Sequence, residues 1–210
     1  MTVAAVLLAA GASSRMGEPK PLVRWGGRTL IEWERDQLLA SRVEEIVIVT
    51  GSRAEAVRRT LGEARRYLVF NQRWPQGRAT SLAKGARALL ESGRPRPSVV
   101  VVQNVDQPAP AHVIDRLVEV LCARVAEGAR IEAVQPTYRD ADGREHGGHP
   151  VVLDGSLLEE LAEASEETEG LRAILERHPP LRLPMPDEPS VALDLDTPEA
   201  LAEGRRVLGA

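Results

Sequence analysis

Residues 3–22 read VAAVLLAAGASSRMGEPKPL, an apolar run followed by a loop with glycine, hydroxyl and basic side chains. An apolar run of this length without alternation is typical of a short strand that is buried on both faces. The loop after it carries backbone N–H groups near Gly11, two serines, and the charges of Arg15 and Lys20. Converging N–H groups and fixed positive charges bind anions. The stretch therefore predicts a buried strand that leads into a binding loop for a polyphosphate.

The spacing of this loop differs from that of the better-known phosphate-binding motifs. A Walker loop needs Gly-x4-Gly-Lys-Ser/Thr, and a dinucleotide fingerprint needs Gly-x-Gly-x-x-Gly at the start of a helix. Here Gly11 and Gly17 are six positions apart, and Pro19 and Pro21 prevent an immediate helix. The spacing disfavours an NAD-dependent enzyme and predicts a long loop that closes over its ligand. The alternative is an ordinary strand-to-helix connection that carries basic residues by chance.

The composition is that of a soluble globular protein, since 43% of the 210 residues are hydrophobic and 28% are charged. This length fits one domain. The formal net charge of −4 argues against general nucleic-acid binding, which needs a basic face. The apolar run at residues 3–10 is far too short to cross a bilayer and lacks the basic start of a signal peptide. We expect a cytoplasmic protein with no nucleic-acid or membrane partner.

The single cysteine, Cys122, excludes an intrachain disulfide and a cysteine-based zinc cluster. Val118, Leu121 and Val125 lie around it at helical spacing, which predicts a core residue.

Apolar runs alternate with amphipathic stretches through the first 128 residues. The expected strands are residues 4–9, 46–50, 67–70 and 99–105, and the expected helices are residues 30–40, 54–61, 80–90 and 110–127. This order predicts an α/β fold, a single Rossmann-like domain with a mostly parallel sheet and helices on both faces. Ligands of such sheets bind at the carboxyl ends of the strands. That rule places four segments on one edge: the first loop and residues 50–52, 71–73 and 104–106.

The regular alternation of apolar runs and amphipathic stretches ends at Gly128. The expected strands are residues 132–138, 150–153 and 191–195, and the expected helices are residues 156–164, 169–177 and 197–208. Thr197 and Pro198 form a good helix start, with a hydroxyl cap and a proline at the first position. Residues 179–189 contain five prolines and are expected to form an ordered surface loop.

Three aspartates are candidates for a metal site. Asp106 follows a predicted buried strand at the edge where the polyphosphate is expected, and carboxylates are ligands of Mg²⁺. Asp194 and Asp196 lie two positions apart on a predicted strand, which places both carboxylates on one face. We expect Asp106 and a member of this pair to bind the metal. As alternatives, Asp106 caps the following helix, and one of the pair caps the last helix.

Two polar segments could contribute to substrate binding. Residues 71–77, NQRWPQG, together with Ser81 could supply amide and backbone groups to a base, and Trp74 could equally pack on the loop. His146 and His149 lie three positions apart in a glycine-rich loop. Two histidines without further ligands are poor evidence for zinc. We expect this segment to shape the pocket of a second substrate.

Together these residues resemble the MobA-like nucleotidyltransferase superfamily, and in particular its molybdenum cofactor cytidylyltransferases. The signature of the superfamily, Leu-Ala-Ala-Gly-x-Ser-x-Arg-Met-Gly-x-x-Lys, is matched at every fixed position from Leu8 to Lys20. Further matches follow in the same order along the chain at residues 71–81, 105–108, 148–150 and 194–199. The resemblance covers the whole chain, and its last two motifs favour the cofactor branch.

The resemblance implies a role for each matching residue. It implies that the nucleotide is bound by Leu8, Ala9, Ala10, Gly11, Ser13, Ser14, Asn71, Gly77 and Ser81. It implies that Arg15 and Lys20 hold the phosphates and act in catalysis with Asp106, that Mg²⁺ is bound by Asp106 with Asp194 or Asp196, and that the acceptor is bound by Gln107, Gly148 and His149. Residues 1–128 would then form the nucleotide-binding part and residues 129–210 the acceptor-binding part.

Three positions bear on the choice of substrates. Guanylyl-transferring relatives usually carry Gly-Gly where this chain has Ala10-Gly11, so the resemblance implies CTP. Pro21 after the lysine and Arg78 at a place that is often Met are departures from the family pattern. These departures leave the acceptor open.

The activity that the resemblance implies is transfer of CMP from CTP to a phosphorylated acceptor, molybdopterin cofactor, with release of pyrophosphate. A molybdoenzyme that receives the product would be a further partner. In-line attack of this kind needs positioning and charge neutralisation, and no nucleophilic side chain. Two alternatives remain open. One is a sugar-phosphate or alcohol-phosphate nucleotidyltransferase of the same superfamily, and the other is a non-catalytic module that binds a nucleotide or delivers the pterin cofactor.

Overall fold

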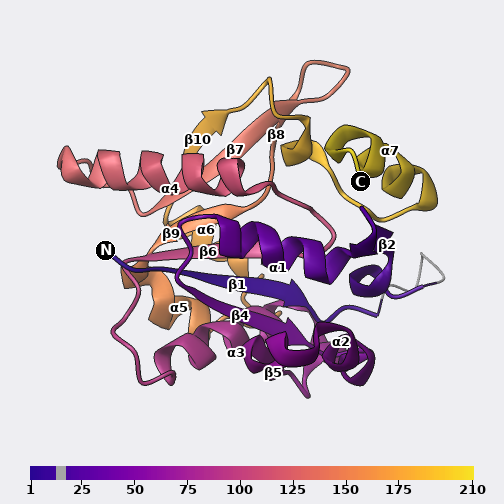
Figure 1. Ribbon diagram of the computed structural model, residues 1–210. Coiled ribbons are helices and arrows are strands. Elements are labelled where there is room, and N and C mark those ends of the chain that lie inside the picture. Colours follow the sequence, from indigo (N-terminus) through magenta and orange to yellow (C-terminus); the bar gives the residue numbers. More distant parts are fainter. Residues whose placement is uncertain (13–17) are drawn as a thin grey trace.

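A computed structural model of the chain describes residues 1–12 and 18–210. Its main sheet has the strand order β10-β7-β9-β6-β1-β4-β5, with β8 paired to β7 (Figure 1). The strands of this sheet are β1 (Val3–Ala9), β4 (Glu45–Thr50), β5 (Leu68–Phe70), β6 (Val99–Asn104), β7 (Ala133–Arg139), β8 (Glu145–Gly147), β9 (Val151–Asp154) and β10 (Leu181–Pro184). A separate small ribbon joins β2 (Arg24–Trp25) to β3 (Arg28–Thr29).

The pairing of the strands confirms the predicted α/β class and the mostly parallel sheet. β1 lies parallel to β4 and β6, β4 lies parallel to β5, and β10 lies parallel to β7. The antiparallel pairs are β6 with β9, β7 with β9, and β7 with β8. Each of these pairs includes a strand that follows Gly128, where the sequence pattern changes.

Helices cover both faces of the sheet, as predicted (Figure 1). They are α1 (Leu30–Ala40), α2 (Ala54–Leu61), α3 (Arg78–Leu90), α4 (Ala111–Ala126), α5 (Leu158–Ala162), α6 (Leu171–Arg177) and α7 (Pro198–Leu208). Alternate residues of β1 belong to two different hydrophobic cores, one on each face of the sheet. On one face, Val3, Ala5 and Leu7 pack with α1 and α4. Ala4, Val6 and Leu8 pack with α3 and α5. The unbroken apolar run of β1 is therefore explained by a strand that is covered on both sides.

The C-terminal third departs from the predicted pattern in two places. The predicted strand at residues 191–195 is wrong, because Pro189–Ala192 form a 3-10 turn and the residues after it join no strand. The alternation of Val191, Leu193 and Leu195 still reflects burial of these side chains. The predicted surface loop at residues 179–189 contains β10, whose Pro184 is tolerated because β10 is the outer strand of the sheet.

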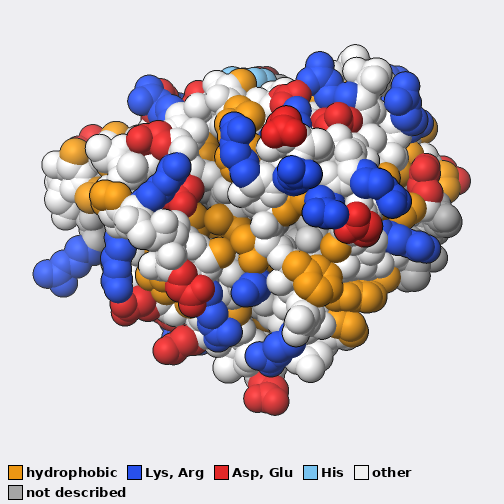
Figure 2. Space-filling model, turned by 60° about the horizontal axis from the view of Figure 1, so that its bottom comes forward, with side chains coloured by type: hydrophobic (Ala, Val, Ile, Leu, Met, Phe, Trp, Pro, Cys, Tyr) orange, Lys and Arg blue, Asp and Glu red, His pale blue; other side chains and the backbone are white. Residues whose placement is uncertain are grey.

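Two smaller points complete the description. Cys122 is half-buried at the margin of the core rather than inside it, so the prediction of a core residue was wrong. None of the helices in the described part of the chain combines the length and apolarity that a membrane crossing requires. Figure 2 shows one face, on which basic and acidic side chains of the described residues are interspersed.

Candidate active site

Backbone hydrogen bonds bring the four predicted segments together at the carboxyl ends of β1, β4, β5 and β6. Ser52 N donates to Ala10 O at 3.0 Å, and Asn71 N donates to Thr50 O at 2.8 Å. Val105 N donates to Leu8 O at 3.1 Å. The prediction that these loops share one edge of the sheet is confirmed.

A cleft of about 320 Å³ opens at this edge. Its walls include Leu8, Ala10, Gly11, Ala12, Lys20, Pro21, Trp74, Pro75, Gly77, Arg78, Ser81, Asn104, Val105, Asp106 and Asp196. Five of the residues assigned to the nucleotide by resemblance line this cleft: Leu8, Ala10, Gly11, Gly77 and Ser81. Ala9 is buried in β1 behind them. Ser13, Ser14 and Arg15 lie outside the described residues.

Asn71 is buried behind the cleft and orients one of its walls. Its amide Nδ2 donates to Thr80 Oγ1 at 2.9 Å and to Ser81 Oγ at 3.0 Å, and its Oδ1 accepts from Arg73 N at 2.9 Å. A buried amide with its hydrogen bonds satisfied holds its neighbours in one arrangement. Asn71 is thus connected to the cleft through Ser81, which lines it.

Trp74 both packs on the loop and lines the cleft, so the two readings of this residue are compatible. It starts a 3-10 turn directly before α3. A Cβ atom on Gly51 would lie 2.5 Å from Trp74 Cβ and 2.8 Å from Ala10 O. Only glycine at position 51 allows the indole and the first loop to approach this closely.

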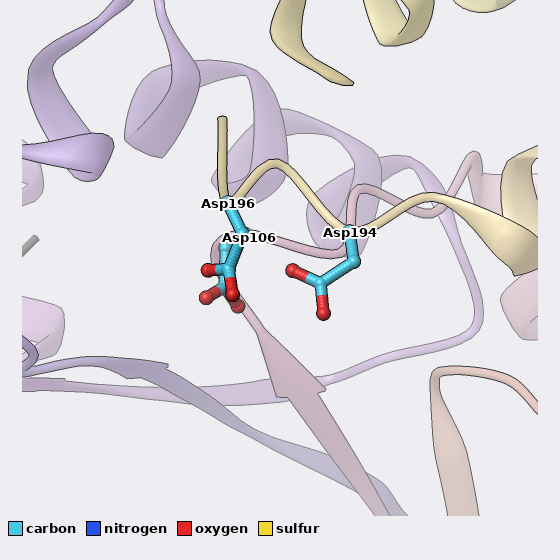
Figure 3. A group of neighbouring side chains, drawn as sticks. All are labelled: Asp106, Asp194 and Asp196. Atoms are coloured by element: carbon cyan, nitrogen blue, oxygen red, sulfur yellow. The ribbon is translucent and has the colours of Figure 1, made fainter. Parts of the chain in front are cut away.

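The three predicted metal ligands converge beside Lys20. One carboxylate oxygen from each of Asp106, Asp194 and Asp196 can be chosen so that all lie within 4.8 Å of one another. Figure 3 shows the side chains of Asp106 and Asp196 directed to the same place and that of Asp194 turned toward them. Lys20 Nζ donates to Asp106 Oδ2 at 2.7 Å and also to Asp196 Oδ1. Three carboxylates offer the oxygen donors that Mg²⁺ or Mn²⁺ prefers, so the donor set fits a divalent cation.

The C-terminal aspartates reach Asp106 through the backbone rather than through a strand. Leu195 N donates to Asp106 O at 2.8 Å, which fixes the extended segment across the end of β6. Neither capping alternative applies to these aspartates. Thr197 caps α7, since its hydroxyl accepts from Ala200 N at 3.1 Å, and the cap position of α4 is Pro110.

The electrostatics of the cluster keep Lys20 charged. Burial disfavours its charge, but hydrogen bonds and attraction from Asp106 and Asp196 outweigh this and raise the pKa of Lys20. The pKa of Asp194 is also raised, by burial and then by the neighbouring charges of Asp106 and Asp196. A further cation would relieve the repulsion among the three carboxylates.

A buried carboxyl group behind this cluster was not predicted. Glu34 on α1 is fully buried, and burial raises its pKa well above the usual range. The amide of Gln103 donates to Glu34 Oε1 at 3.4 Å, to Asn104 O at 3.2 Å and to Gln107 O. The amide of Gln103 thus closes the turn that leads to Asp106.

A second cavity of about 540 Å³ adjoins the cleft. Leu8, Arg78 and Asn104 line both. The remaining walls of the second cavity include Ala79, Leu82, Gln135, Gly147, His149, Val151, Glu166, Glu169, Gly170, Leu171, Arg172, Leu175, Glu176, Pro180 and Arg182. No sequence motif contains the polar residues Gln135, Glu166, Arg172 and Arg182. They lie far apart in the sequence and come together only in the folded chain.

The residues assigned to the acceptor lie around this second cavity in different ways. His149 lines it, with its ring nitrogens 3.4 and 3.5 Å from Asn104 Nδ2. Gln107 lies behind Asn104, whose Nδ2 donates to Gln107 Oε1 at 2.5 Å. Gly148 is buried and bonds Pro136 O through its N–H at 2.8 Å. His146 is held elsewhere, since it lies 2.7 Å from Asp140 Oδ2 and stacks on Tyr138.

Protonation of His149 should destabilise the protein in acid. Burial and then the charge of Arg78 lower the pKa of His149 from 6.5 to about 4. Between these values the unfolded chain binds more protons than the folded one, so the free energy of unfolding falls as the pH falls. We expect this group to remove about 3 kcal/mol between its two pKa values. Urea denaturation across this range should show a shallower pH dependence for His149→Gln than for the wild type, and an equal slope would contradict the assignment.

Gly148→Ala should destabilise the fold and disturb the metal site. A Cβ atom on Gly148 would lie 2.3 Å from Val191 O, in the 3-10 turn that precedes Asp194. Overpacking of this kind costs about 1–3 kcal/mol, which urea denaturation measures. At Gly11 an added Cβ meets nothing within 4 Å, so Gly11→Ala is the matched control for stability. Equal stabilities of the two variants would show that the turn moves without cost.

Known proteins resemble this chain at the level of the family. Residues 5–181 match a family described as the MobA-like NTP transferase domain. The chain is 31% identical over 202 residues to nicotine blue oxidoreductase of Paenarthrobacter nicotinovorans, across 95% of this chain and 94% of that protein. It is 33% identical over 180 residues to the bifunctional IPC transferase and DIPP synthase of Rubrobacter xylanophilus, across 81% of this chain and 37% of that protein.

Solved structures show the same fold. The Mycobacterium tuberculosis H37Rv protein Rv0371c is similar with a TM-score of 0.72 at 26% identity, across 100% of both chains. A complex of that protein with manganese is similar with a TM-score of 0.68 at 24% identity.

Proposed function

The chain belongs to the MobA-like NTP transferase family, and on this premise we propose that it transfers CMP from CTP to molybdopterin cofactor with release of pyrophosphate. The observation that carries the proposal is the convergence of Lys20, Asp106, Asp194 and Asp196 at a cleft next to the loop after β1. A triphosphate needs positive charge, and a divalent cation needs carboxylates. The cleft offers both within one small volume.

The nucleotide would enter the cleft with its phosphates toward Lys20. Ala10 at the start of the loop, where guanylyl-transferring relatives usually carry glycine, supports CTP as the donor. The base would then lie against the wall that contains Ser81 and Gly77. The second cavity adjoins the cleft and would hold the acceptor, with His149 and Asn104 on its wall.

In the proposed reaction an acceptor phosphate oxygen attacks the α-phosphorus, and the bond to the pyrophosphate oxygen breaks. Lys20 keeps its proton and donates hydrogen bonds to oxygens on which negative charge increases. Asp106, with Asp194 or Asp196, would hold Mg²⁺, which when bound neutralises charge on the phosphates. Glu34 and Gln103 keep the turn that carries Asp106 in place. No side chain needs to form a covalent intermediate.

The similarity to nicotine blue oxidoreductase favours a second candidate, an oxidoreductase activity, because it extends over nearly all of both chains. Transfer to a sugar phosphate or an alcohol phosphate, and delivery of the pterin cofactor without catalysis, are the remaining candidates.

Pyrophosphate release tests these candidates together. The wild-type protein with Mg²⁺ is mixed with CTP, GTP, ATP or UTP and with molybdopterin, a sugar phosphate or an alcohol phosphate, and pyrophosphate is measured. A parallel assay follows oxidation of NADH in the presence of nicotine blue. Release with CTP and molybdopterin alone supports the proposal. Release with another acceptor reassigns the substrate, and NADH oxidation or binding without turnover overturns the transferase.

A further inference from the structure

Arg78 stands at the junction of the two cavities. It is the first residue of α3, its side chain is exposed, and it lines both the nucleotide cleft and the second cavity. An acceptor in the second cavity must pass its reacting group across this junction to reach a phosphate in the cleft. Arg78 therefore lies beside the path of the attacking group.

The position of Arg78 is unfavourable for the helix. The N-terminus of a helix carries a partial positive charge, so a cation in the first turn is destabilising. α3 has no acidic residue in its first turn. Its N-terminus is capped instead by Glu166, a residue distant in the sequence, whose carboxylate accepts from Ala79 N. A Cβ atom on Gly77 would collide with this carboxylate, 2.2 Å from its carbon. The stability of α3 thus gives no reason for an arginine at position 78.

Within residues 1–12 and 18–210, Arg78 has no side-chain hydrogen bond or ion pair, and its charge acts on His149 and Asp194 without direct contact. The other arginines of the second cavity form ion pairs with glutamates. Arg172 lies 3.1 Å from Glu176 and 3.5 Å from Glu169, and Arg182 lies 3.2 Å from Glu145. The rest of the described wall contains the carboxylate of Glu166, which accepts from Ala79 N, the amide of Gln135, and apolar side chains such as Leu82, Leu171 and Leu175. The lowered pKa of His149 keeps that ring neutral near pH 7.

We propose that Arg78 binds the anionic group of the acceptor at the junction of the two cavities and so selects an acceptor that carries a phosphate monoester. A guanidinium can bind two phosphate oxygens at once, which orients the third toward the cleft. The apolar side chains and the amide of Gln135 in the second cavity suit the body of a heterocycle. This inference rests on the proposed function and adds the residue that selects the acceptor.

Steady-state kinetics of Arg78→Met distinguish an effect on acceptor binding from an effect on CTP binding. We expect the KM for molybdopterin to rise by roughly tenfold or more, as a hydrogen-bonded charge pair is worth at least 1.4 kcal/mol, while the KM for CTP stays unchanged. Arg78→Lys should recover part of the loss, because it restores charge without the two-pronged contact. Arg87→Met is the matched control, because Arg87 is an exposed arginine of the same helix that lines neither cavity, and it should change neither constant. A rise in the KM for CTP instead would overturn the proposal.

A sulfate titration tests Arg78 without any turnover. Sulfate is added to the full-length protein with saturating CTP, and the side-chain Nε–H signals of arginine are followed by NMR. The Arg78 signal, assigned by its loss in Arg78→Lys, should shift and saturate, while the Arg172 signal should not. An unshifted Arg78 signal overturns the inference. If the wild type releases no pyrophosphate with any triphosphate, the proposed function fails, and the sulfate result alone decides whether Arg78 binds anions.

Discussion

Lys20→Ala should lower the turnover for CMP transfer by roughly 10²–10³-fold, the loss expected when one donor to a charged transition state is removed. Lys20 is buried beside the cleft and keeps its proton, because Asp106 and Asp196 outweigh the cost of burial. Alanine removes the positive charge and leaves the carboxylates to repel one another. Pyrophosphate release at saturating CTP and acceptor measures the effect, and folding is checked by urea denaturation.

Lys84 is the matched control for this prediction. It is the other lysine of the chain, on α3, and it lines neither cavity. Lys84→Ala should leave turnover unchanged. Lys20→Arg should recover part of the activity, since the charge remains while its geometry changes. Turnover of Lys20→Ala within a few-fold of the wild type would remove Lys20 from the proposed mechanism.

Asp106→Asn should reduce turnover on the order of 100-fold and weaken metal binding, because the amide keeps the shape of the side chain and removes its charge. Asp106 lies at the end of β6, where the backbone of Leu195 holds it against the C-terminal segment. The metal affinity is measured by titration with Mn²⁺, independently of turnover. Chelation of divalent cations should abolish transfer by the wild type.

The same titration decides between the two remaining ligands. Of Asp194→Asn and Asp196→Asn, the one that weakens Mn²⁺ binding identifies the partner of Asp106. Asp187→Asn is the control, since Asp187 is exposed and lies outside the three-aspartate cluster. Unchanged Mn²⁺ affinity in Asp106→Asn would place the metal elsewhere or exclude it.

Local patterns in the sequence predicted most of the sheet and the residues at its carboxyl edge. The unbroken apolar runs of β1 and β6 predicted strands covered on both faces, because no other short element buries every side chain. The start of α7 at Thr197 was also predicted from neighbouring residues alone, because a hydroxyl cap followed by proline needs no distant partner. The strand at residues 191–195 was wrong because alternating burial arises wherever an extended segment crosses a core, with or without a neighbouring strand.

The second cavity illustrates what local patterns leave out. Gln135, Glu166, Arg172 and Arg182 belong to separate elements, and none of them stands in a motif. Arg78 was noticed only as a departure from a family pattern. Its place between two cavities became visible only in three dimensions.

By itself the sequence determined the class of fold, the loop after β1 and the identities of the charged residues beside it, because each depends on neighbours within a few positions. The tertiary structure alone decided that Asp194 and Asp196 meet Asp106, since one backbone hydrogen bond from Leu195 joins segments that are far apart in the chain. It also decided the second cavity and the place of Arg78 in it. Such contacts depend on how whole elements pack, and packing is a property of the folded chain rather than of any short segment.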